Sequence, residues 1–209
     1  MQFAKHWAAA LDDYAIDLAW SPDGTLLAAV SAAGGITLFD AATDAVKYKL
    51  AGHPDGANCL AWMPGGTGLA TGGQDGCVRF WDAVTGAQTA EVALGNAWVE
   101  HLAWSAVGPR FLFAAAGRKL VALATDGTLA HTFTDAPKTI SALALAPASS
   151  LQPSTSAIAA ACFGHVVVWD ATTFAVQKEF PYGNAIYALV WSPDGRWLVA
   201  GCHDNAVHL

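Results

Sequence analysis

The chain has 209 residues, of which 54% are hydrophobic and only 13% are charged. This composition excludes an intrinsically disordered chain, which would combine few apolar residues with a high density of charge. The net charge of −7, with only ten Lys and Arg residues, argues against a nucleic-acid partner, because phosphate recognition requires clustered basic side chains.

One five-residue phrase returns along the chain at nearly constant spacing. Its first copy is Leu-Ala-Trp-Ser-Pro at residues 18–22, and the third residues of the copies are Trp20, Trp62, Trp104, Leu145 and Trp191. A second motif, an aromatic residue followed by Asp, recurs with the same period. Its first residues are Phe39, Trp81, the degenerate Leu123 and Trp169. A period of about 40–45 residues with four short strands per unit is typical of a β-propeller, whose blades bury their apolar faces by stacking on one another.

The sequence therefore predicts one all-β domain over residues 1–209. In chain order, residues 1–13 contain a candidate ring-closing outer strand at residues 3–10. Four-stranded antiparallel blades follow, at about residues 14–53, 54–96, 97–137, 138–183 and 184–209, and the last is incomplete.

Residues 56–96 carry the clearest repeat. Apolar segments at residues 58–62, 69–73, 77–82 and 88–94 are separated by turns rich in glycine, which indicates a four-stranded meander. The third repeat has a second turn shortened to Gly117-Arg118. The fourth is lengthened by a polar loop at residues 149–156.

These segments resemble the WD40 repeat family over residues 14–209. The resemblance rests on Gly52-His53, on residues 69–76 and on Val78-Arg79-Phe80-Trp81-Asp82. It implies a structural hydrogen-bonded tetrad made of His53, Thr71, Asp75 and Trp81. Because such a tetrad satisfies its own polar groups, we prefer it to a hydrolytic triad built around His53 and Asp75.

The other repeats depart from this pattern. Ala33 and Phe163 stand at the turn positions of the first and fourth repeats, whereas the fifth keeps Asp204 there, with Asn184 near the expected Gly-His. The recurring tryptophans occupy one structural position, so we expect all four of them, Trp20, Trp62, Trp104 and Trp191, to lie in the core.

About four and a half blades form only part of a ring. The simplest expectation is that the sequence belongs to a longer, seven-bladed protein. The alternative is that a second chain completes the ring, and an open sheet edge would favour such self-association.

Residues near the N-terminus lack the apolar run of a signal peptide, and no stretch of about 18 strongly apolar residues could span a bilayer. The cysteines, Cys59, Cys77, Cys162 and Cys202, have no zinc-binding spacing, so we expect buried thiols in a reducing compartment. A soluble cytoplasmic protein without a membrane partner follows as the expectation.

No catalytic motif, phosphate-binding loop or metal-binding motif is present. His203 and His208 lie five residues apart around a turn, and we interpret them as turn and strand residues rather than as a metal pair. We therefore expect no catalytic residue, no metal and no cofactor.

In propellers, loops at one face of a rigid scaffold usually carry recognition. The residues that repeat register assigns to this face include Asn58 and Ser141, and the candidate partner-binding residues are Tyr14, Gln74, Trp98, Glu100, Tyr187 and His203. The sequence thus favours a non-catalytic protein-binding scaffold. Three alternatives stay open: a propeller enzyme, a propeller that binds a small ligand or metal, and a regulatory domain of a larger protein.

Overall fold

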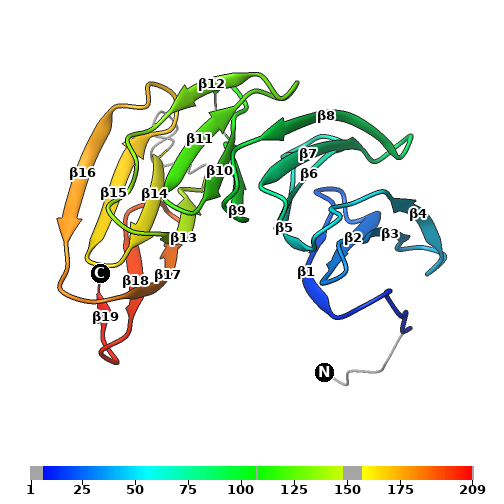
Figure 1. Cartoon of the computed structure of the whole chain (residues 1–209), viewed down its shortest axis with the longest axis horizontal. Coiled ribbons are helices and arrows are strands. Elements are labelled where there is room, and N and C mark those ends of the chain that lie inside the picture. Colours follow the sequence, from blue (N-terminus) through cyan, green and yellow to red (C-terminus); the bar gives the residue numbers. More distant parts are fainter. Residues whose placement is uncertain (1–6, 107, 148–156, 209) are drawn as a thin grey trace.

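The computed structural model describes residues 7–106, 108–147 and 157–208. The helices and strands assigned within these residues are all β-strands. They form five antiparallel sheets that follow one another along an arc (Figure 1). Each sheet is a meander in chain order, so each is one blade. The predicted all-β partial propeller is confirmed. In this described part of the chain, no helix has the length and apolar character needed to cross a membrane.

The blades contain the following strands. Blade 1 contains β1 (Ala15–Trp20), β2 (Leu26–Ser31), β3 (Ile36–Asp40) and β4 (Val46–Leu50). Blade 2 contains β5 (Ala57–Trp62), β6 (Gly68–Gly73), β7 (Cys77–Asp82) and β8 (Ala87–Ala93). Blade 3 contains β9 (Val99–Trp104), β10 (Leu112–Ala116), β11 (Lys119–Leu123) and β12 (Leu129–Thr132). Blade 4 contains β13 (Ile140–Leu145), β14 (Ala157–Cys162), β15 (His165–Asp170) and β16 (Val176–Pro181). Blade 5 contains β17 (Ile186–Trp191), β18 (Leu198–Cys202) and β19 (Val207–His208).

Burial explains why the second strands of blades 1 to 4 lack a clean alternation of apolar and polar residues. Strands β10 and β14 are buried along their whole length, because neighbouring blades cover both of their faces. Many of their residues are alanine, whose small side chain lets the sheets approach closely. The apolar clusters accordingly lie between blades rather than within one blade.

The recurring tryptophan of the first strand links each blade to the blade before it. The indole Nε1–H of Trp62 donates to the carbonyl of Ala19 at 3.0 Å, and that of Trp104 donates to Ala61 at 3.1 Å. Trp191 donates to Ala144 at 3.2 Å in the same way. The tryptophan therefore contributes a directional hydrogen bond as well as apolar area.

Trp20 departs from this rule, and its predicted place in the core is wrong. Its side chain is 53% exposed, whereas Trp104 is buried and Trp62 and Trp191 are half-buried. By register, Trp20 faces the side of blade 1 that has no preceding blade in the described structure. The neighbouring Leu18 is exposed for the same reason.

The predicted ring-closing strand is not seen in the part of it that the structure describes. Residues 7–10 form no strand, and residues 3–6 lie outside the described residues. Trp7 instead packs against Phe39 of β3, with ring centroids 5.3 Å apart. The polar loop predicted at residues 149–156 also lies outside the described residues. Of the cysteines, Cys59 and Cys162 are buried, but Cys77 and Cys202 are only half-buried.

Candidate functional site

Blade 2 holds the four tetrad side chains in one hydrogen-bonded chain. His53 Nε2 lies 2.9 Å from the Thr71 hydroxyl, and the indole of Trp81 donates to that same hydroxyl oxygen at 2.9 Å. On the other side of the ring, His53 Nδ1 lies 2.9 Å from Asp75 Oδ1. Arg79 completes the group by donating to Asp75 Oδ2 at 2.6 Å. The chain ties the loop before β5 to the β6–β7 turn and to β7.

Arg79 Nη1 also lies 2.5 Å from His53 Nδ1, so this nitrogen has both a carboxylate and a guanidinium beside it. We assign its proton from the contact with the carboxylate. The Asp75 carboxylate can only accept, so His53 carries its proton on Nδ1 and donates to it. Nε2 then accepts from the Thr71 hydroxyl, which in turn accepts from Trp81. Burial lowers the pKa of His53, against the hydrogen bond to Asp75, which raises it. Burial opposes ionisation of Asp75, but hydrogen bonds from Arg79 and His53 hold the pKa of that carboxyl below its usual value.

This arrangement leaves no activated nucleophile among the four tetrad side chains. The Thr71 hydroxyl is fully buried and uses its oxygen and proton within the network. His53 is 1% exposed, so a substrate has no access to its ring. A hydroxyl poised for catalysis would need both a free base and an approach path. The tetrad therefore stabilises the fold of blade 2.

Blade 5 has a residue in the place of His53, but it is not Asn184, the residue that the sequence suggested. The backbone N–H of His53 donates to Gly34, in the second turn of the preceding blade. In blade 5 the residue that makes this bond, to Gly164, is Tyr182 rather than Asn184. The Tyr182 hydroxyl donates to Asp204, which stands where Asp75 stands in blade 2. A tyrosine therefore takes the histidine's place, and a search for Gly-His could not find it.

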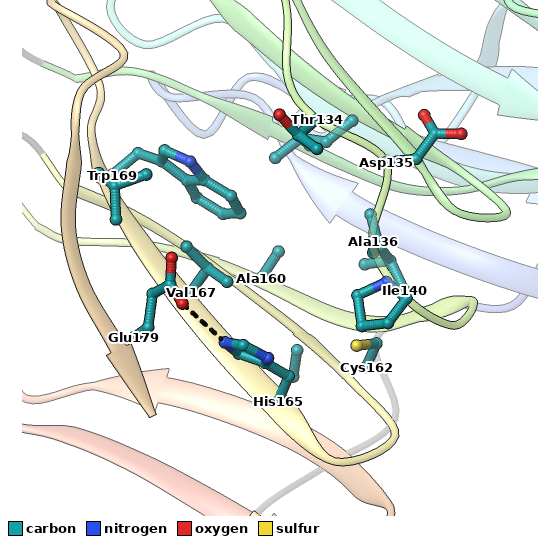
Figure 2. A pocket seen from close by; sticks show the side chains of 14 residues that line it. Thr134, Asp135, Ala136, Ile140, Ala160, Cys162, His165, Val167, Trp169 and Glu179 are labelled. Atoms are coloured by element: carbon teal, nitrogen blue, oxygen red, sulfur yellow. Dashed lines mark ion pairs between the residues drawn. The ribbon is translucent and has the colours of Figure 1, made fainter. Parts of the chain in front are cut away.

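Blade 4 has a cavity where blade 2 has its tetrad. Ala136 occupies the place of His53, as its N–H donates to the second turn of blade 3. Strand pairing puts Ala160 in the place of Thr71 and Val167 in that of Arg79, whereas Trp169 is kept. The β14–β15 turn is also one residue shorter than β6–β7, which removes the aspartate position. A cavity of about 250 Å³ results (Figure 2).

The lining of this cavity includes an ion pair between β15 and β16. Glu179 pairs with Val167 across β15 and β16, as Glu91 pairs with Arg79 in blade 2, so it lacks the arginine partner. It lies instead 3.4 Å from His165 Nε2, the contact drawn in Figure 2. The alanine-rich sequence of β14 hid this cavity, because each alanine alone is an ordinary strand residue.

Filling the cavity should stabilise the protein. We expect Ala160→Thr to raise the free energy of unfolding by about 1 kcal/mol, because its hydroxyl would give the Trp169 indole the acceptor that Thr71 gives Trp81. The thermal midpoint should rise by about 2–4 °C. Ala159→Thr is the matched control, since Ala159 is fully buried in a different apolar cluster and should lose stability. Equal losses in both variants would contradict the cavity.

The predicted partner-binding residues lie on what we call the loop face, formed by the starts of the first strands and the turns between second and third strands. Tyr14 is 82% exposed, Trp98 51% and Tyr187 62%. Glu100 and His203 are also exposed, whereas Gln74 is half-buried. Its backbone N–H donates to Gly56, so Gln74 belongs to the junction within blade 2 as well as to the face.

Two of these six residues have rings that meet. The rings of Tyr187 and His203 have centroids 5.9 Å apart in blade 5. Tyr14 lies at the start of blade 1, at the other end of the arc, and Trp98 and Glu100 lie at blade 3 (Figure 1). The predicted set is therefore spread along the arc rather than gathered in one place.

Two other positions that register assigned to the loop face are used between blades. Asn58 Nδ2 donates to the Val99 carbonyl at 3.3 Å, and the Ser141 hydroxyl donates to the Ile186 carbonyl at 2.5 Å. Both bonds reach the following blade. These two side chains therefore join blades, and Tyr187 is the residue at the same position in blade 5.

A hollow that sequence reasoning missed lies on the loop face between blades 4 and 5. Its volume is about 490 Å³, and it is lined by Lys138, Thr139, Ser141, Phe163, Ala185, Ile186 and Tyr187. Phe163, at the tip of the β14–β15 turn, is 54% exposed. A phenylalanine at a turn tip was the one available signal, because turns normally carry small or polar residues.

Comparisons with known proteins agree with this architecture. A family model described as "WD domain, G-beta repeat" matches residues 45–82 and 176–209. A second, described as "Anaphase-promoting complex subunit 4 WD40 domain", matches residues 2–63. No curated protein matches the chain. The two family models together span residues 2–82 and 176–209, more than half of the sequence, and the matched segments include the tetrad of blade 2. The chain therefore belongs to the WD40 repeat proteins.

Proposed function

We propose that this chain is a non-catalytic scaffold that binds a protein partner through its loop face at blades 4 and 5. The observation that carries the proposal is the hollow flanked by two exposed aromatic side chains, Phe163 and Tyr187. Aromatic side chains in well-packed hollows are the usual energetic centres of protein interfaces. Lys138 adds a positive charge at the rim.

The scaffold supports this role by holding the hollow in place before a partner arrives. Ser141 fixes β13 to β17, and the Trp191 indole adds a second bond between the same two blades. A surface that is already ordered loses less conformational entropy on binding. Trp98 and Glu100 of blade 3 would extend the contact along the same face.

Two further observations fit a binding role. WD40 repeats in general mediate protein–protein interactions, and one matching family model is named for a subunit of a multi-subunit complex. The His-Asp pair of blade 2 is committed to a buried structural network, which supports the absence of hydrolytic chemistry there.

Site-specific photo-cross-linking tests the proposal. A photoreactive residue at position 187 or 163 should form a discrete covalent adduct with a partner protein in cells. The same residue at Gln177, exposed on the outer strand β16, is the matched control and should give none. Cross-links of equal yield from position 177 would contradict a binding site on the loop face.

A further inference from the structure

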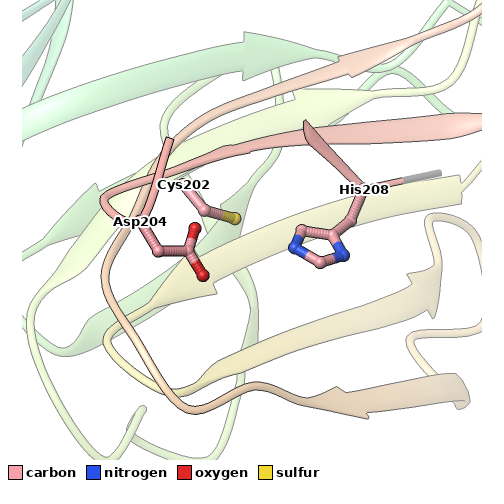
Figure 3. A group of neighbouring side chains, drawn as sticks. All are labelled: Cys202, Asp204 and His208. Atoms are coloured by element: carbon pink, nitrogen blue, oxygen red, sulfur yellow. The ribbon is translucent and has the colours of Figure 1, made fainter. Parts of the chain in front are cut away.

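Blade 5 carries three different metal-ligating side chains around the turn between β18 and β19. Cys202 ends β18, Asp204 lies in the turn and His208 ends β19. A sulfur, a carboxylate oxygen and a ring nitrogen from these residues all lie within 4.8 Å of one another (Figure 3). In the described part of the chain, no other group of three such side chains is this close.

Comparison with blade 2 shows what normally stands at this place. There the turn carboxylate, Asp75, forms an ion pair at 2.6 Å with Arg79, which lies four residues later in the sequence. In blade 5 the corresponding residue is His208, four residues after Asp204. Among the described residues, neither Lys nor Arg forms an ion pair with Asp204. The repeat thus keeps the carboxylate but replaces its permanent cation with a metal-ligating side chain.

The thiol adds a second difference between the two blades. Strand pairing puts Cys202 in the place of Gly73, since Cys202 pairs with Ile186 as Gly73 pairs with Ala57. A side chain at Gly73 would run into the His53 ring, because an added Cβ would lie 2.3 Å from Nδ1. In blade 5 the space beside the turn contains the Cys202 sulfur instead.

A fourth polar group lies beside the three. The Tyr182 hydroxyl is hydrogen-bonded to Asp204 and lies 2.9 Å from His208 Nε2. It therefore links two of the candidate ligands and orients them toward one another. Groups that hold metal ligands in this way usually strengthen a metal site.

We propose that Cys202, Asp204 and His208 bind a zinc ion. Cysteine sulfur, histidine nitrogen and carboxylate oxygen are the ligands that zinc takes, at about 2.0–2.3 Å. The thiolate favours zinc over magnesium or calcium, which prefer oxygen. Asp204 and His208 are exposed and Cys202 is half-buried, so their side chains can rotate to close the remaining distance. Water takes the fourth position, and Tyr182 orients Asp204 and His208 through its hydrogen bonds.

Such an ion would fix the turn that carries His203, beside Tyr187 of the loop face. The proposal goes beyond protein binding, and its test is independent of any partner. Titration of the 209-residue chain with cobalt(II), a spectroscopic substitute for zinc, should give one equivalent of binding. Its absorption should include the near-ultraviolet band of a thiolate–cobalt bond, and added zinc should abolish it.

Cys202→Ser should remove this band, whereas Cys77→Ser, which changes the other half-buried thiol, should leave it unchanged. Asp204→Asn and His208→Ala should each weaken zinc binding by about tenfold or more in a competition titration with a chelating dye. His203→Ala, in the same turn, should bind zinc as the unchanged chain does. Thermal melts establish that each variant is folded. Absence of the thiolate band in the unchanged chain, or its persistence in Cys202→Ser, would overturn the proposal.

Discussion

Replacing Gly34 with alanine should lower the free energy of unfolding by about 4 kcal/mol or more, and should leave little folded protein at elevated temperature. Gly34 has a φ of +95°, a conformation that residues with a Cβ rarely adopt. An added Cβ would also lie 1.6 Å from the backbone oxygen of His53. Because that atom belongs to the backbone, no side-chain rotation relieves the overlap.

The overlap falls at a junction that cannot easily move. The His53 N–H donates to the Gly34 carbonyl at 3.0 Å, so the two backbones are already in direct contact. Separating them would break this bond and displace the His53 ring from its buried position. The effect should therefore reach blade 2 as well as blade 1.

Gly24→Ala is the matched control for this prediction. Gly24 also has a positive φ, +72°, but an added Cβ would have no atom within 4 Å. It should cost about 1 kcal/mol, the usual penalty for a left-handed alanine. Chemical denaturation of both variants measures the difference. Similar losses would mean that the close approach of the two blades is not as described.

The second large effect is expected from His53→Ala. The substitution removes a fully buried ring and leaves the Thr71 hydroxyl and the Asp75 carboxylate each without one hydrogen bond. Such losses in a buried network should lower the free energy of unfolding by about 3 kcal/mol. For a domain of this size, the thermal midpoint should fall by about 6–12 °C. His203→Ala, at an exposed position, should leave the melt unchanged.

A double-mutant cycle separates the network from simple loss of volume. Thr71→Val removes the hydroxyl but keeps the shape of the side chain. If the hydroxyl and the ring act through one another, the double variant should lose less than the sum of the two single losses. A blade without both groups can still fold, because blade 4 has Ala136 and Ala160 in the places of His53 and Thr71. Strict additivity would argue against the hydrogen-bonded chain.

The same histidine should make stability depend on pH. Its pKa is lowered in the folded state, chiefly by burial, from an ordinary value of 6.5. The unfolded chain therefore binds a proton at a higher pH than the folded chain does. The contribution of neutral His53 is complete above pH 6.5 and is lost as the pH falls through the folded pKa. Denaturation of His53→Ala across this range should lack that component.

The blade architecture could be predicted from sequence because its signals are local. Most turns have their own glycine, and most strands have their own apolar run. In three turns without glycine, Asp44, Phe174 and Asn205 take the left-handed conformation instead. The strands predicted in blade 2, at residues 58–62 and 77–82, accordingly agree with β5 and β7 to within one residue. The repeat then fixed the order of the blades, because each has to pack on the next.

Features that depend on a neighbour could not be predicted in this way. The burial of Trp20 depends on a preceding blade, which a repeat phrase does not report. The role of Tyr182 depends on which residue meets the second turn of blade 4, and a hydrogen bond rather than a motif identifies it. The segment at residues 3–10 looked like a strand, but its described part packs as a loop, with Trp7 against blade 1.

The candidate binding face shows the same division. Register assigned Tyr187, at the start of β17, and His203, in the turn after β18, to one face. It could not show that their rings lie 5.9 Å apart. Nor could it reveal the hollow beside Phe163, because residues of both blade 4 and blade 5 line it. The assignment of these residues to a partner stays a prediction.

The indole bonds between blades have a consequence for how such chains can change in length. The first-strand tryptophans of blades 2, 3 and 5 each donate to the preceding blade, whose first strand offers one carbonyl in return. A duplicated or deleted unit of 42 residues, the spacing between Trp20 and Trp62, adds or removes one donor and one acceptor together. Gene duplication can therefore lengthen the array without leaving a buried polar group unsatisfied. Blade 4 is the exception, because it has Leu145 in place of the tryptophan and so lacks the indole donor. Copies of that blade would join the preceding blade without this hydrogen bond.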